Sequence, residues 1–109
     1  MLEALLGSAN RERVLLFLHA RGEGYAREMS RFFESDLDPI QKQLDKLEAG
    51  GIVASRMVGR TRLYAFNPRC PFLKEIRSLA DKVLTFCPDA LHERLVMNRR
   101  RPRRRGKPL

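Results

Sequence analysis

The sequence predicts a mainly helical domain that carries a small β-hairpin. Apolar residues recur at helical spacing over much of the first 86 positions, and two β-prone runs, 52–58 and 62–66, flank Gly59. Glycine permits the tight reversal that a hairpin requires. The expected order is helix, short strand, helix, turn, helix, hairpin and helix, which is the layout of a winged helix-turn-helix.

The segment before residue 37 is expected to hold helices and a minimal strand. Leucines at 2, 5 and 6 suggest a short amphipathic turn or helix, and Ser8 precedes a helix that ends at Gly22. Its predicted apolar stripe consists of Val14, Leu15 and Leu18, extended by the stem of Arg11. Tyr25 can lie in a minimal strand, and a second helix is predicted from the spacing of Ala26, Met29, Phe32 and Phe33.

The helix over 38–49 has the clearest start signal in the chain. Asp38 suits the N-cap, Pro39 suits the first helical position, and Gln41 lies where a capping box has its second partner. Gly50 and Gly51 end the helix, and one of them can adopt the left-handed conformation. The core-facing residues are expected to be Ile40, Leu44 and Leu47.

A long amphipathic helix is predicted within 71–86. Residues 1–86 then form the winged helix-turn-helix domain, while 87–109 hold a short helix and a basic, flexible tail. The apolar residues of the long helix form two sets, and the second can cover the domain: Leu73, Ala80 and Leu84. We expect the first set to form a homodimer interface: Phe72, Ile76, Leu79 and Val83. The alternative is one broad stripe in a monomer.

The charge is positive and unevenly distributed. The net charge of +9 comes from 22 basic and 13 acidic residues, and seven of the basic residues lie within 99–107. Without these seven, 15 basic residues face 13 acidic ones, so the body is nearly balanced. A polyanionic partner is expected, with nucleic acid ahead of membrane. No run of 18 apolar residues occurs, and a cytoplasmic location is expected.

The helix over 38–49 presents side chains that suit DNA. Lys42 and Lys46 point away from the apolar face, with Pro39 and Asp45 on the same side, and Gln41 and Gln43 lie on the two shoulders. Glutamine can pair with adenine, and lysine can donate to guanine or phosphate oxygens. Taken alone, this pattern also fits an ordinary solvated helix face.

The hairpin adds basic residues of one sign. Arg56, Arg60 and Arg62 surround the turn, with Thr61 beside them, and no acidic residue occurs between Glu48 and Glu75. Arginine at such a tip can enter the minor groove or hold phosphates. Charges also protect edge strands from aggregation, but that purpose does not require a single sign.

Enzymatic and metal chemistry find little support. The sequence has no glycine-rich phosphate loop, no HExxH and no nucleophile with an evident base, so we expect neither catalysis nor a cofactor. His19 and His92 are expected to be structural or solvent-facing. Cys70 and Cys87 are expected to be reduced, and a metal site combining them with His92 could arise only across a dimer.

Two long stretches resemble a known family. "LLGSANRERVLLFLHARGEGYAREMSRFF" and "LDPIQKQLDKLEAGGIVASRMVGRTRLYAFNP" resemble the winged helix-turn-helix repressors of the ArsR type. The closest likeness is to the small winged-helix module that often precedes a nucleotidyltransferase domain. In that module "Y-x-x-NP" and a "P-x-L-x-x-I/L" helix also follow the wing, and the likeness covers residues 1–86.

The resemblance implies duplex DNA binding by a regulator, more often a repressor. The DNA-reading helix maps onto 38–49, and the wing maps onto the hairpin. Base and phosphate contacts are thereby implied for Asp38, Pro39, Gln41, Lys42, Gln43 and Lys46, and wing contacts for Arg56, Arg60, Thr61 and Arg62. "EMSRFFESDL" lacks the cysteines of metal-sensing members, and the nucleotidyltransferase half is missing, so the controlling signal is unidentified.

Two other functions remain open. One is a module that binds structured RNA or a protein partner, or nucleic acid without sequence preference. The other is a redox- or metal-responsive regulator that depends on its cysteines.

Overall fold

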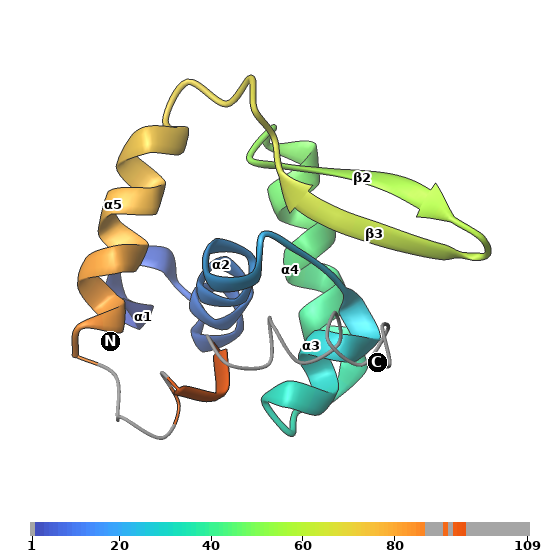
Figure 1. Cartoon of the computed structure of the whole chain (residues 1–109), viewed down its shortest axis with the longest axis horizontal. Coiled ribbons are helices and arrows are strands. Elements are labelled where there is room, and N and C mark those ends of the chain that lie inside the picture. Colours follow the sequence, from blue (N-terminus) through green and yellow to red (C-terminus); the bar gives the residue numbers. More distant parts are fainter. Residues whose placement is uncertain (1, 87–90, 92, 96–109) are drawn as a thin grey trace, which may run out of the picture.

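Figure 1 shows the chain as a helical body from which a β-hairpin projects. This computed structural model describes residues 2–86, 91 and 93–95. The elements, in chain order, are α1 (Glu3–Leu6), α2 (Ala9–Arg21), β1 (Glu23–Tyr25), α3 (Ala26–Phe32), α4 (Leu37–Ala49), β2 (Val53–Val58), β3 (Thr61–Phe66) and α5 (Leu73–Leu84). The expected order of helices, minimal strand and hairpin is confirmed.

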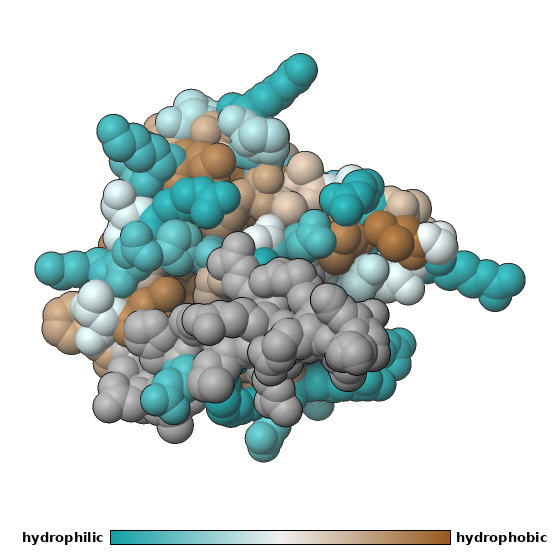
Figure 2. All heavy atoms as spheres, viewed as in Figure 1, coloured by the Kyte–Doolittle hydropathy of each residue, from teal (hydrophilic) through white to brown (hydrophobic). Residues whose placement is uncertain are grey.

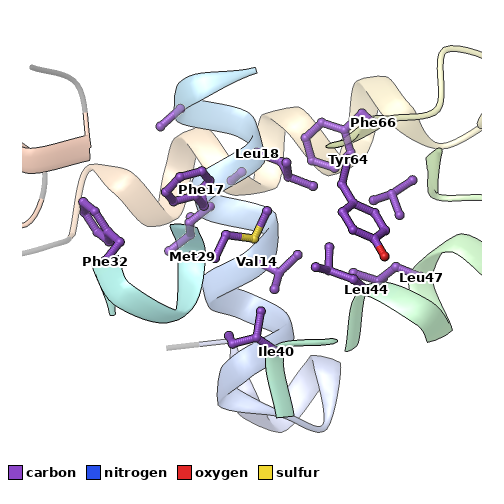
Figure 3. Close-up of a cluster of buried hydrophobic side chains, with 14 of the residues drawn as sticks. Val14, Phe17, Leu18, Met29, Phe32, Ile40, Leu44, Leu47, Tyr64 and Phe66 are labelled. Atoms are coloured by element: carbon purple, nitrogen blue, oxygen red, sulfur yellow. The ribbon is translucent and has the colours of Figure 1, made fainter. Parts of the chain in front are cut away.

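Helix α2 forms the centre of the body. It begins where the Ser8 hydroxyl accepts a hydrogen bond from the Arg11 backbone N–H at 3.2 Å, as the sequence predicts for an N-cap. Leu16 and Phe17 are buried as well as the predicted Val14 and Leu18, since neighbours cover α2 on several sides. Figure 3 shows Val14, Phe17 and Leu18 among side chains of α3, α4 and β3. The core therefore surrounds α2 instead of lying along one stripe of it.

The three strands form one antiparallel sheet in the order β1-β3-β2. Gly24 of β1 pairs with Tyr64, and Ser55 of β2 pairs with the other side of the same residue. Gly59 closes the hairpin with a φ of 64°, a conformation that favours glycine. Gly24 is needed for a different reason: a Cβ there would lie 2.5 Å from a ring carbon of Phe17.

The start of α4 differs from the prediction. The helix begins at Leu37, and its N-cap is Asp36, which makes no side-chain capping hydrogen bond. Asp38 therefore lies inside the first turn and is not the N-cap. Leu37 packs against the core, and this contact accounts for a helix that extends beyond the local sequence signal. At the other end Gly51 adopts a φ of 80°, in the left-handed region predicted for one of the two glycines.

Helix α5 packs against α2 through residues of both predicted apolar sets. Ala80, Val83 and Leu84 are buried in the core of the same chain. Val83, only 3 % exposed, is therefore wrongly placed in the expected dimer set. His19 Nε2 lies 2.6 Å from Asp81 Oδ1 and joins α2 to α5, a structural role for this histidine.

The core continues beyond residue 86. Residues 91 and 93–95 are helical, and Leu95 is fully buried against the core formed by the preceding helices. Arg21 donates to the backbone oxygens of Arg94 and Leu95, and its guanidinium lies 4.5 Å from the Phe17 ring centroid. Burial lowers the pKa of Arg21, while Glu28 raises it and Arg94 lowers it further.

Candidate nucleic-acid interface

The outward face of α4 carries charges of both signs. Lys42 and Lys46 are exposed, as expected for side chains opposite the apolar face. Asp38 and Asp45 are exposed beside them, and Pro39 is half-buried. The helix face therefore has a mixed charge, in keeping with the predicted position of Asp45 on the same side as the lysines.

The two glutamines of α4 lie on its shoulders, as predicted, and both have partners within the chain. Gln41 donates from Nε2 to the Tyr64 hydroxyl at 2.8 Å and to Asp45 Oδ1 at 3.1 Å. Gln43 Oε1 accepts a hydrogen bond from Arg11 Nε at 2.8 Å. Gln41 therefore faces the hairpin and Gln43 faces α2. Each must exchange or share these bonds before it can contact a base.

The arginines of the hairpin differ in what they contact. Arg56 lies 3.6 Å from a carboxylate oxygen of Glu23, and both side chains are more than half exposed. Arg62 donates to the Ser55 hydroxyl at 3.0 Å, and Ser55 donates to Glu48 at 2.7 Å.

Arg60 lies at the turn, exposed, and within the described part of the chain it makes no hydrogen bond or ion pair. Figure 2 shows hydrophilic atoms at the far end of the hairpin, next to apolar surface. Met57 and Val58, the last two residues of β2, are 54 % and 42 % exposed. The hairpin tip therefore offers one free cation beside exposed apolar side chains.

The hairpin and α4 are joined at their base. The face of β2 and β3 that carries Ser55 and Tyr64 is turned toward α4, because these residues bond to Glu48 and Gln41 respectively. Figure 1 shows the hairpin extending away from α4 beyond this junction. The predicted helix residues and the predicted hairpin residues thus belong to one continuous structural unit.

Two further cations lie close to this unit and are absent from the sequence prediction. Arg27 and Arg31 are exposed on α3, four residues apart and so on one helical face. They line a cleft of about 340 Å³ together with Tyr25, Glu28 and Thr61. The i, i+4 arginine spacing on a predicted helix was a usable signal, but its position beside the hairpin depends on the sheet.

Other chemistry has few candidate groups. No cluster of three or more potential metal ligands occurs among the described residues. Cys70 is a buried free thiol, an environment typical of inert cysteines. Cys87, His92 and the arginine-rich segment 99–109 lie outside the described residues. Within the described part of the chain, no helix is both long and apolar enough to cross a membrane.

The fold of the chain resembles those of several solved structures. A double mutant of Lactococcus lactis ZitR in apo form gives a TM-score of 0.56 at 17% identity, with 78% of this chain covering 67% of that one. The adhesin competence repressor AdcR of Streptococcus pyogenes gives a TM-score of 0.56 at 13% sequence identity. The match covers 84% of this chain and 80% of that one.

A third similar structure is the MarR family transcriptional regulator SPO1453 of Silicibacter pomeroyi. It gives a TM-score of 0.56 at 18% identity over 90% of this chain and 67% of that chain. The fold is a winged helix-turn-helix. At these identities the likeness shows the fold alone. The sequence itself matches no protein-family model and no curated protein.

Proposed function

We propose that this winged helix-turn-helix chain is a sequence-specific regulator of transcription that binds duplex DNA as a homodimer. The observation that carries the proposal is the junction of Gln41 and Tyr64, which holds α4 beside a hairpin whose tip presents Arg60. A helix that enters the major groove and an arginine that reaches the flanking backbone or minor groove need this kind of fixed relationship.

In this proposal Lys42 and Lys46 contact base edges or phosphates, because both are exposed on the outward face of α4. Gln41 and Gln43 contribute after exchanging their internal bonds, and Asp38 and Pro39 lie at the entry of the helix. Arg60 and Thr61 contact the backbone from the hairpin, with Arg56 and Arg62 behind them. Contacts of this kind fix register through phosphates and specificity through bases.

Repression by occupying a promoter is the proposed mode of action, and a cytoplasmic location accords with it. AdcR is described as a repressor and SPO1453 as a transcriptional regulator, which supports this choice for a chain of the same fold. The homodimer is proposed to form through exposed residues of α5, chiefly Phe72 and Leu79, with Ile76 beside them. Two copies should then prefer half-sites about 10 bp apart or a multiple of it.

Selection of DNA sequences in vitro against the purified protein tests this function. The expected result is an enriched motif with two-fold symmetry. Lys42→Ala should lower the preference for that motif by roughly 1–3 kcal/mol. Lys82→Ala is the matched control, because Lys82 is an exposed lysine on α5. Enrichment of no motif, with weak and salt-sensitive binding to every sequence, would refute sequence-specific regulation.

The mixed charge of α4 favours a second candidate, binding of nucleic acid without sequence preference. Asp38 and Asp45 repel phosphates close to Lys42 and Lys46, and the amide of Gln41 is already engaged. In that case affinity would come from the arginines of the hairpin and the tail, and all sequences would bind alike.

A further inference from the structure

The cleft between α3 and the hairpin is lined by hydrogen-bond donors that suit an anion with several oxygen atoms. It holds about 340 Å³ and is lined by Tyr25, Arg27, Glu28, Arg31 and Thr61. These residues come from the end of β1, the exposed side of α3 and the first position of β3. Two guanidinium groups and two hydroxyl groups therefore border one open space.

The two arginines are uncommitted. Within the described residues neither Arg27 nor Arg31 has a side-chain hydrogen bond, an ion pair or an aromatic partner. By contrast, Arg56 has Glu23 and Arg62 has Ser55. Two unpaired guanidinium groups one helical turn apart repel each other, and an anion bound between them removes that repulsion.

The one carboxylate that lines the cleft is engaged elsewhere. Glu28 Oε1 accepts the Tyr25 backbone N–H at 3.2 Å, and Oε2 lies 3.5 Å from Arg21 Nη1. Arg21 thus balances the charge of Glu28 from the inner side of α3. The cleft keeps a net positive charge, contributed by Arg27 and Arg31.

We infer that this cleft binds a phosphodiester group of the DNA backbone, an inference that rests on the proposed function. Thr61 lines the cleft and directly follows Arg60 at the hairpin turn, so the cleft adjoins the free cation of the tip. Arginine binds phosphate oxygens through paired N–H groups, and threonine and tyrosine hydroxyls add single hydrogen bonds. The contact fixes the protein on the duplex and reads no sequence.

The test compares Arg27→Ala, Arg31→Ala and the double variant with the full-length wild-type chain on a selected site and on scrambled DNA. Arg69→Ala serves as the matched control, because Arg69 is exposed in the turn after β3 and does not line the cleft. Binding is measured by fluorescence anisotropy from low to high salt. Thermal unfolding of each variant checks that these exposed substitutions leave the fold intact.

Each single variant should lose about tenfold in affinity on both DNAs at low salt. The slope of log K against log salt should become shallower by about 0.9 for each phosphate contact removed. Tyr25→Phe and Thr61→Val should give smaller losses of the same kind. Arg69→Ala should keep the wild-type slope and affinity.

Three outcomes overturn the inference, and they are distinguishable. If wild type binds its selected site and Arg27→Ala and Arg31→Ala bind it equally well, the cleft binds no phosphodiester group. The proposed function then still stands. If inorganic phosphate saturates the cleft in NMR titrations and the variants lose only that binding, the ligand is a free anion and not DNA. If wild type binds no DNA, the proposed function and the inference fail together.

Discussion

The side-chain nitrogen of Gln41 lies 2.8 Å from the hydroxyl oxygen of Tyr64, 23 positions later in the chain. Tyr64 is 2 % exposed, and in Figure 3 its hydroxyl points toward α4 beside Leu44 and Leu47. The same nitrogen donates to Asp45 one turn further along the helix. A single amide thus ties the outward part of α4 to the centre of β3, which limits how far the hairpin can rotate against the helix.

Tyr64→Phe is predicted to loosen this junction while it keeps the ring in the core. The free energy of unfolding should fall by about 0.5–1.5 kcal/mol, because one partly buried hydrogen bond is lost. DNA affinity should fall as well, although Tyr64 itself touches no DNA in our proposal. Urea denaturation and anisotropy measure the two effects. Tyr25→Phe is the control for stability. Equal denaturation midpoints for the two variants would show that the hydrogen bond between Gln41 and Tyr64 does not stabilise the fold.

Local signals in the sequence were sufficient for the elements. Ser8 marks the start of α2, and Gly51 and Gly59 mark reversals whose positive φ values only glycine adopts readily. The start of α4 was displaced because Leu37 gains contact with the core, which capping preferences do not include. Burial of Leu16 and Phe17 was missed because a central helix is covered on more sides than one periodic stripe indicates.

Side-chain pairing could not be predicted, because it depends on which segments the fold brings together. Arg11 contacts Gln43, 32 positions later, and Arg56 on β2 reaches Glu23 on β1 across the central strand β3. The candidate interface could be located from residue types in α4 and the hairpin. Only the fold showed that Arg60 at the turn has no partner among the described residues, and placed Arg27 and Arg31 in one cleft with Thr61.

Gly24→Ala is predicted to destabilise the fold because of a close approach between β1 and α2. The added Cβ would lie 2.5 Å from Phe17 Cε1, and Phe17 is fully buried and cannot move freely. Overpacking of this kind costs typically about 1–3 kcal/mol. Gly50→Ala is the control, since its φ is −84° and its Cβ would meet Lys46 O at an ordinary 3.5 Å. Similar urea midpoints for both variants would show that β1 shifts without cost.

Phe72→Asp and Val83→Ala are predicted to separate association from folding. Phe72 is 63 % exposed at the N-cap of α5. An aspartate at this end is compatible with the positive end of the helix dipole, while it removes apolar surface. Sedimentation velocity should show a dimer for wild type and a monomer for Phe72→Asp. Val83→Ala should instead lower unfolding stability, because Val83 belongs to the core of its own chain. A Phe72→Asp variant that remains dimeric would place the interface elsewhere.

Deletion of residues 99–109 is predicted to flatten the salt dependence of DNA binding. Seven basic residues are removed, and each one that contacts a phosphate contributes about 0.9 to the slope of log K against log salt. The site enriched by selection should stay the same, since a run of arginines on phosphates carries no sequence information. A changed motif after the deletion would mean that the segment reads groove shape.

Arg60→Ala is predicted to weaken binding to all DNA sequences alike and to leave stability unchanged. Arg60 has no partner among the described residues, so its removal breaks no internal bond. Arg62→Ala provides the comparison. Arg62 donates a hydrogen bond to Ser55, and Ser55 donates one to Glu48, so this variant should lower both the DNA affinity and the free energy of unfolding. The Arg60 variant should also lower the salt slope by about one. Selective loss at A·T-rich flanks would contradict a phosphate contact, because a narrow minor groove attracts arginine by its shape.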